Sequence, residues 1–101
     1  MKFEWDKQKR KANIRKHGFD FAEAARVFEG DTLTILDDRE EYGEERFVTL
    51  GLLKGVVVVI VHTEEENLIR IISMRKATKN EEINYFKKIG HELETGKGDD
   101  G

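Results

Sequence analysis

The spacing of apolar residues has a helical period before residue 30, a strand period after it, and a helical period again beyond residue 78. Asp20 and Glu23 have the spacing of a capping box, which marks the start of a helix, and Gly30 ends it. Behind this start, apolar side chains recur at i, i+3, i+4 and i+7, at Phe21, Ala24, Ala25 and Phe28. This spacing predicts a helix that buries one stripe in the core.

The segment before this helix, residues 7–17, also has helix signals but little apolar surface. Asp6 is a suitable N-cap, and Gly18 stands where a helix commonly ends in the left-handed conformation. Ala12 and Ile14 are its main candidates for burial, so most of this helix should face water. A short strand over residues 1–5 is expected to precede it.

After residue 31 the pattern is that of an antiparallel meander of four strands, Thr32–Leu36, Arg46–Leu53, Val56–Thr63 and Leu68–Arg75. Lys54 and Gly55 suit a two-residue hairpin turn between the second and third of them. The run from Val56 to Val61 has no alternation, so we expect both faces of that strand to be covered at the centre of the sheet.

A second capping box, Thr78 to Glu81, predicts a closing helix whose Ile83, Phe86, Ile89 and Leu93 can face the sheet. Helices that are segregated from a meander indicate an α+β fold. At 101 residues the chain has room for one domain, which we assign to residues 1–93, with a flexible tail over residues 94–101.

Charge is segregated along the chain, although the formal net charge is only −3. Residues 1–18 hold seven basic and two acidic side chains, and residues 46–91 hold eight and five. Residues 19–45 hold ten acidic side chains against two basic ones. The two basic regions together predict a positive face that attracts a polyanion, because attraction depends on local potential. The alternative is a solvated, salt-bridged surface.

Several classes of chemistry are disfavoured by the composition. The chain has no Cys, and its three His residues lack metal-ligand spacing, so we expect no metal and no cofactor. Its single Ser, Ser73, has no glycine-rich elbow around it, and no phosphate-loop motif is present. The longest apolar run is too short to span a bilayer and the N-terminus lacks a signal-peptide pattern, so we expect a cytoplasmic protein with no membrane partner.

Arginines, hydroxyls and a histidine on the predicted elements suit the cleavage of a phosphodiester. Strict alternation along the last strand places Arg70, Ile72, Met74 and Lys76 on one face and Ile69, Ile71, Ser73 and Arg75 on the other. A guanidinium fork matches phosphate oxygens, but each arginine has an ion pair with a nearby Glu as its alternative. RNA would supply its own nucleophile, the 2′-OH, and need only a base, an acid and cations.

His17 and His62 have different expected roles. His17 ends a helix, where the dipole favours the imidazolium form, so it is a candidate acid or a simple capping residue. His62 adjoins the Val/Ile run and is expected to be packed and hydrogen-bonded.

Several motifs of this chain, in this order, resemble those of the BrnT toxins, up to about residue 90. They are FEWD at Phe3–Asp6, Lys9, Asn13, KHG at Lys16–Gly18, Phe21, Ala24 and Phe28, GEERFVTLG at Gly43–Gly51, HTEE at His62–Glu65, IRIISMRKAT at Ile69–Thr78, Glu81 and Tyr85.

This resemblance implies a toxin of a bacterial type II toxin–antitoxin system with a RelE/ParE-like fold. It implies a ribonuclease that arrests translation, a BrnA-like protein antitoxin as partner, and contact with DNA only through that antitoxin. By position, the residues expected to be catalytic are Lys16, His17, Arg46, Thr63, Arg70 and Arg75, and those expected to bind substrate are Lys9, Lys76 and Tyr85. Arg46 and Arg75 would hold the phosphate, Thr63 would orient an oxygen, and His17 or Glu45 would move protons.

Two other functions stay open on the sequence. A non-catalytic module could use a basic face to bind an acidic protein or a nucleic acid. ParE-like relatives suggest a third possibility, a poison of DNA gyrase. Loss of cleavage without loss of partner binding in arginine variants would favour the ribonuclease.

Overall fold

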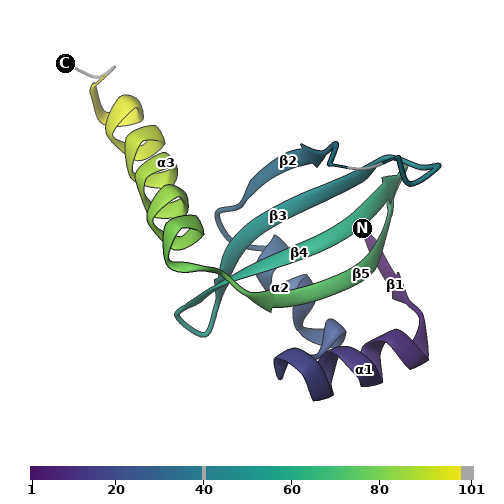
Figure 1. Cartoon of the computed structure of the whole chain (residues 1–101). Helices are drawn as coiled ribbons and strands as arrows, with labels where there is room; N and C mark the ends of the chain where they lie inside the picture. The colour runs from purple at the N-terminus through teal and green to yellow at the C-terminus, as the bar shows by residue number, and fades with distance from the viewer. Residues whose placement is uncertain (40, 99–101) are drawn as a thin grey trace.

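The chain forms one curved sheet with helices on both of its sides (Figure 1). This computed structural model describes residues 1–39 and 41–98, with side chains up to residue 90. The elements are β1 (Lys2–Trp5), α1 (Lys7–His17), the 3-10 turn η1 (Phe21–Glu23), α2 (Ala24–Phe28), β2 (Leu33–Asp37), β3 (Arg46–Leu53), β4 (Val56–Glu65), β5 (Leu68–Lys76) and α3 (Lys79–Gly98).

The five strands are arranged in the order β1-β5-β4-β3-β2. β2 to β5 form the predicted antiparallel meander, and β1 adds to its far edge, parallel to β5. The α+β class is therefore confirmed. The expected RelE-like arrangement differs in two details: the sheet is five-stranded and mixed, and the second predicted helix consists of η1 followed by the five-residue α2.

The two faces of the sheet are covered to different extents. On the covered face, η1 and α2 bury Phe21, Ala24 and Val27 against alternate residues of β4 and β5. On the other face, the start of α3 packs Tyr85 over Leu50 and Val59. The predicted burial of both faces of β4 is confirmed from Val57 to Ile60. The rest of this second face, which we call the open face, carries Arg46, Val61, Thr63, Arg70, Ser73 and Arg75.

A β-bulge in β5 decides which side chains reach the open face. Val61 is opposite Ser73 but His62 is opposite Ile71, so Ile72 is an extra residue on β5. Beyond the bulge, Met74 turns into the buried cluster with Ile69 and Ile71. Arg75 therefore lies on the same face as Arg70. The predicted strict alternation, which separated these two arginines, is wrong past Ile71.

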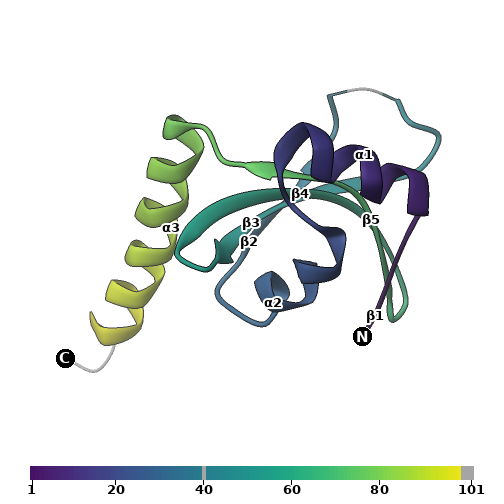
Figure 2. The ribbon, with the colours of Figure 1, turned by 90° about the horizontal axis from the view of Figure 1, so that it is seen from below.

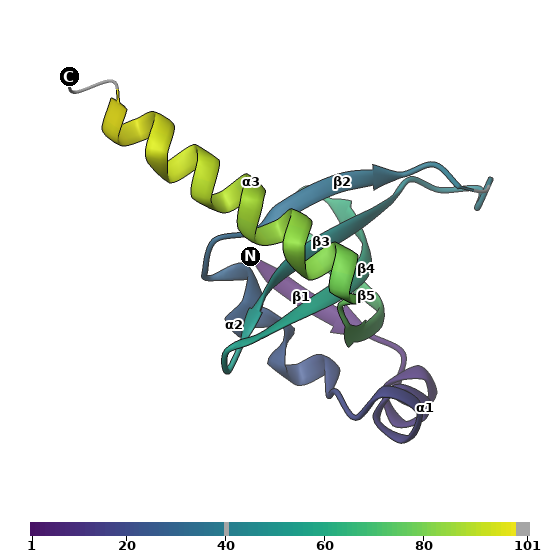
Figure 3. The ribbon, with the colours of Figure 1, turned by 60° about the vertical axis from the view of Figure 1, so that its left-hand side comes forward.

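α1 lies beside β5, beyond the point where β1 stops pairing, and one side chain makes the connection. The Asn13 amide nitrogen donates to the Met74 carbonyl (2.8 Å), and the Asn13 amide oxygen accepts from the Met74 N–H (3.1 Å). Asn13 thus replaces the neighbouring strand that β5 lacks there. α1 and the connection between β2 and β3 rise on the side of the sheet opposite to α2 (Figures 2 and 3).

α3 begins as predicted, with reciprocal hydrogen bonds between Thr78 and Glu81. Its helical backbone runs to Gly98, so residues 94–98, which we assigned to a tail, are helical; residues 99–101 lie outside the described residues. The flexibility of that end stays a prediction.

Of the predicted sheet-facing stripe of α3, only Ile89 packs against the sheet among the members with described side chains, and Tyr85, which was not predicted to do so, packs beside it. Tyr85 is buried and Ile89 is partly buried, whereas Ile83 and Phe86 are 43% and 50% exposed. Tyr85 and Ile89, at i and i+4, share the face of α3 that meets the sheet, whereas Ile83 and Phe86 lie on other faces of the helix. Beyond its first turns α3 extends away from the sheet (Figures 1 and 3). The Leu93 side chain lies outside the described side chains.

Candidate functional site

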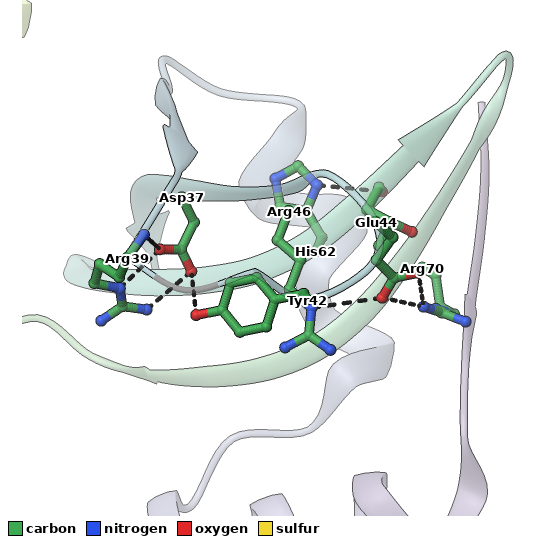
Figure 4. A network of polar contacts seen from close by, with 8 residues as sticks. Asp37, Arg39, Tyr42, Glu44, Arg46, His62 and Arg70 are labelled. Atoms are coloured by element: carbon green, nitrogen blue, oxygen red, sulfur yellow. Dashed lines mark hydrogen bonds and ion pairs between the residues drawn. The ribbon is translucent and has the colours of Figure 1, made fainter.

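The open face gathers arginines that each hold a carboxylate. The Arg70 guanidinium donates to both oxygens of Glu44, at 2.8 Å each. The Nε of Arg46 lies 3.5 Å from the same carboxylate, and its guanidinium carbon lies 4.1 Å from the centre of the Tyr42 ring. Two arginines from different strands therefore converge on Glu44 (Figure 4). The two guanidinium groups thus share one carboxylate.

The Nε of Arg46 is the one buried polar side-chain atom without a hydrogen-bond partner among the residues that the structure describes. A buried donor left unpaired costs about 1–3 kcal/mol, so its retention calls for an explanation. An oxygen atom of a bound anion would satisfy it.

Thr63 lies beside this pair. It is opposite Arg70 in the β4–β5 register and is buried. Together with Glu44 these two residues line a small hollow of about 70 Å³, whose other walls include Glu4 and Glu65. A hydroxyl and a guanidinium thus face the same space, among several carboxylates.

Arg75 and Arg39 belong to a second, larger hollow. This groove of about 360 Å³ runs over Val59, Val61 and Ser73 between the two arginines. Arg75 makes two parallel hydrogen bonds to Glu81, at 2.8 and 2.9 Å. Arg39 does the same to Asp37, at 2.7 and 2.9 Å.

These hydrogen bonds lower the pKa of both carboxyl groups. Hydrogen bonds from Arg75 are the largest cause that lowers the pKa of Glu81 to about 2. Hydrogen bonds from Arg39 lower the pKa of Asp37 to about 2 in the same way. Both carboxylates are therefore ionised at neutral pH, and the open face is charge-compensated rather than simply positive. The predicted alternative for each arginine, an ion pair with a neighbouring acid, is realised in the unliganded protein.

The nine predicted site residues divide into three groups, one on the open face, one on α1 and a pair that lies elsewhere. Arg46, Thr63, Arg70 and Arg75 share the open face, as described above. Lys9, Lys16 and His17 lie on α1, and within the described residues none of them has a hydrogen bond or ion pair to that set. The structure thus brings together four of the nine.

The remaining two predicted residues have other surroundings. Tyr85 is buried in the cluster beneath α3, and its hydroxyl donates to the Asp31 carbonyl at 2.6 Å. This packing accounts for Tyr85, so no contact with a substrate is needed to explain the residue. Lys76 is opposite Val58, a residue of the covered face, and so points away from Arg75.

His62 is a packed histidine, as predicted. It is fully buried, and its Nε2 lies 2.7 Å from the Thr49 hydroxyl, which in turn is 2.7 Å from that of Thr34. The ring stacks on Phe47 and meets the edge of Phe28. Burial is the main cause that lowers the pKa of His62, so the ring is neutral at pH 7.

Four residues of this region were not predicted from the sequence: Asp37, Arg39, Tyr42 and Glu44. They lie at the end of β2 and in the connection that follows, which reads as a run of loop acids. Glu45, the acid we expected to move protons, is exposed, and its neighbour Glu44 makes the contacts. The single available signal was the run of acidic residues, which does not say which acid turns inward.

Within the described part of the chain, no group of three His, Cys, Asp or Glu side chains has a geometry that could hold a metal ion. No helix among the described residues combines the length and apolar composition needed to cross a bilayer.

Comparison with known proteins places this geometry in a family. No curated protein matches the chain. The family model for the ribonuclease toxin BrnT of type II toxin–antitoxin systems matches residues 5–81, from the end of β1 to the first turn of α3. This span contains α1, the whole meander and every arginine of the open face. The chain therefore belongs to the BrnT family of ribonuclease toxins.

Proposed function

We propose that this toxin cleaves RNA on the open face, without a metal ion, by attack of the ribose 2′-OH on the adjacent phosphorus. The observation that carries the proposal is the β-bulge at Ile72, which aligns Arg75 with Arg70 on the face that also holds Arg46 and Thr63. A transition state for this attack carries extra negative charge on the phosphate oxygens, and fixed guanidinium groups stabilise such charge.

In the proposed mechanism the scissile phosphate replaces the Glu44 carboxylate between Arg46 and Arg70. The unpaired Nε of Arg46 then finds an oxygen acceptor, and Thr63 donates to another phosphate oxygen. Glu44, released from Arg70 but still close, takes the proton of the attacking hydroxyl. The bond from phosphorus to the 5′-oxygen breaks, and that oxygen takes a proton from water. The products are a 2′,3′-cyclic phosphate and a free 5′-OH.

The proposal extends to the cellular context of the toxin. A type II system includes a protein antitoxin, and we propose a BrnA-like protein that covers the open face and blocks access of RNA to its arginines. On this hypothesis the toxin acts in the cytoplasm, arrests translation, and meets DNA only through that antitoxin.

Purified protein incubated with RNA in EDTA tests the mechanism. We expect cleavage with 2′,3′-cyclic phosphate ends, and no cleavage where the nucleotide before the scissile bond is 2′-deoxy. Arg70→Ala and Arg75→Ala should each abolish it. Arg26→Ala is the matched control, since Arg26 is an exposed arginine of α2, on the other side of the sheet.

Two outcomes would overturn the proposal. Intact RNA at high protein concentration in EDTA, with cleavage restored by a divalent cation, would show that the chemistry needs a metal. Full activity of both arginine variants would show that the open face is not the site. Loss of antitoxin binding alone in these variants would instead indicate a non-catalytic binding surface.

A further inference from the structure

α1 carries cations of a different kind from those of the open face. Lys7, Lys11 and Arg15 are exposed and follow one another at i, i+4 and i+8, in a single row along the helix. Within the described residues, none of the three has a carboxylate within ion-pair distance. The one cation of α1 that is paired is Arg10, whose Nε lies 2.7 Å from Asp20. Lys9 and Lys16 are exposed as well.

We propose that α1 is a second contact surface for RNA, which binds the phosphate backbone of a single strand outside the cleavage site. The inference rests on the proposed function of the open face, and it replaces the expected catalytic role of Lys16 with RNA binding, the role already expected of Lys9. The ligand is defined by its chemistry: a flexible polyanion, contacted at its phosphates, that extends beyond the nucleotides on the open face.

The charge pattern of α1 works against the stability of the helix itself. Like charges at i and i+4 destabilise a helix, and Lys7 places a cation at the end where the dipole is positive. The Asp6 carboxylate caps this end, but the first turn itself has no acidic residue, and Asn13 is the one buried residue of the helix. Helix stability favours Arg15, which lies in the last turn, but neither packing nor the dipole favours Lys7 and Lys11, and a partner of opposite charge would give these two cations a role.

The position of α1 connects it to the cleavage site. α1 follows the β5 edge of the sheet and rises on the side of the open face (Figures 2 and 3). Its distance from that face is fixed by the hydrogen bonds of Asn13 to Met74, the residue immediately before Arg75. The row of three cations spans about 12 Å at 1.5 Å per residue, which is enough for several phosphates.

The β2 edge of the sheet, opposite to α1, is unfavourable for a bound RNA strand. The connection after β2 lines a hollow in which Asp37 and Glu44 are paired with arginines, whereas Asp38, Glu41 and Glu45 have no ion pair among the described residues and repel phosphates. An RNA strand that leaves the arginines therefore runs toward β5 and α1, and not toward β2. This asymmetry distinguishes α1 from cations elsewhere on the surface.

The test compares two triple variants of the full chain. K7Q/K11Q/R15Q removes the row, and R26Q/K87Q/K88Q removes three exposed cations from α2 and α3. The probe is a fluorescent single-stranded RNA with 2′-O-methyl groups throughout, which binds but cannot react. Its affinity is measured by anisotropy over a series of salt concentrations.

We expect the row variant to bind about tenfold more weakly at low salt, with a slope of log affinity against log salt smaller by about 2, because each contact to a single strand contributes about 0.7. The KM for cleavable RNA should rise in parallel while kcat stays within a factor of about 2. The control variant should match the wild type. Single-stranded DNA of equal length should lose affinity equally, since phosphate contacts do not read the sugar.

Failure of this inference is separable from failure of the proposed function. Unchanged affinity and salt slope in the row variant, with wild-type cleavage, would overturn the role of α1 alone. An unchanged RNA affinity with weakened antitoxin binding would also overturn it, in favour of a protein partner. Absence of RNA cleavage by the wild type would remove the proposed function, whereas the binding measurement would still report on α1.

Discussion

The arginines of the open face and the cations of α1 have the same charge but opposite surroundings. Arg70 and Arg75 are each held by two hydrogen bonds to a carboxylate, and the acidic partners cancel most of their field. Lys7, Lys11 and Arg15 project into water without such partners among the described residues. The arginines of the open face are held in one orientation but attract an anion only at short range. The cations of α1 attract a polyanion over a longer distance but are not held in one orientation.

This difference matches the two tasks that a ribonuclease must perform. Stabilising a transition state requires donors that are already in position, because reorganising them during the reaction costs energy. Capturing a polyanion requires an uncompensated field, and long lysine side chains in water are sufficient for that. We infer that the toxin separates the two tasks between the sheet and α1, and the following predictions test that separation.

The largest expected effect is on catalysis when geometry changes but charge does not. Arg75→Lys keeps the positive charge and loses the guanidinium fork. We expect kcat to fall about 100-fold, equivalent to about 2.7 kcal/mol, with KM almost unchanged. Lys11→Arg, the matched exchange on α1, should leave kcat unchanged. Single-turnover cleavage at saturating RNA measures the rate of each variant. Equal losses of rate in Arg75→Lys and Lys11→Arg would refute the division of tasks.

A smaller but clear effect is expected on stability at the junction of the two regions. Asn13→Ala removes both hydrogen bonds to Met74 and leaves backbone groups of β5 unpaired. The free energy of unfolding should fall by about 2 kcal/mol, as measured by urea denaturation.

Two further results sharpen this prediction. Asn13→Asp should be intermediate, because a carboxylate can accept from the Met74 N–H but cannot donate to its carbonyl. The RNA affinity of Asn13→Ala should also fall, since α1 loses its fixed distance from Arg75. An Asn13→Ala protein of wild-type stability would show that α1 is held by other contacts.

The paired region should also be the acid-sensitive one. Hydrogen bonds from arginine lower the pKa of Asp37 and Glu81 to about 2, below the ordinary values of 3.8 and 4.5. Because these pKa values are lowered by folding, the stability they contribute is complete above about pH 4.5 and is lost as the pH falls toward 2. Each pair contributes about 1 kcal/mol at most, because solvent screens it.

Unfolding in urea at pH 6, 4 and 3 measures this loss. Glu81→Gln should remove part of the dependence on pH, whereas the K7Q/K11Q/R15Q variant should keep all of it, since lysines do not titrate in that range. A pH dependence that Glu81→Gln leaves unchanged would show that the Arg75 pair contributes nothing to stability.

The smallest expected effect is on the free energy of unfolding when the row of Lys7, Lys11 and Arg15 is removed. K7Q/K11Q/R15Q removes like-charge repulsion at i, i+4 and replaces it with neutral residues of good helix propensity. We expect the free energy of unfolding to rise by a few tenths of a kcal/mol while RNA affinity falls. A loss of stability instead would show that these cations support the fold, which would weaken the argument for a second binding surface.

The elements of the fold were largely predictable because each depends on a local rule. Asp6 caps α1 through two backbone N–H groups, and Gly18 ends it at a φ of 78°. Lys54 and Gly55 both have positive φ, as a tight hairpin turn requires. These signals involve residues two to four positions apart, so the order of residues alone carries them.

The arrangement of the candidate site was not predictable, because it depends on contacts between distant segments. The bulge at Ile72 arises from how β4 and β5 pair, and it reverses the side to which Arg75 points. Glu44 meets Arg70, which is 26 residues later in the chain, because the sheet brings the two together. No periodicity in the sequence encodes either event.

The sequence by itself determined the helices, the meander and the segregation of charge, since these follow from neighbouring residues and their chemistry. The resemblance of its motifs indicated the family, which the match over residues 5–81 confirmed. Only the tertiary structure decided which cations are neutralised by a carboxylate and which are not. That distinction depends on distances of a few ångströms between side chains from separate strands, and a linear pattern does not contain such distances.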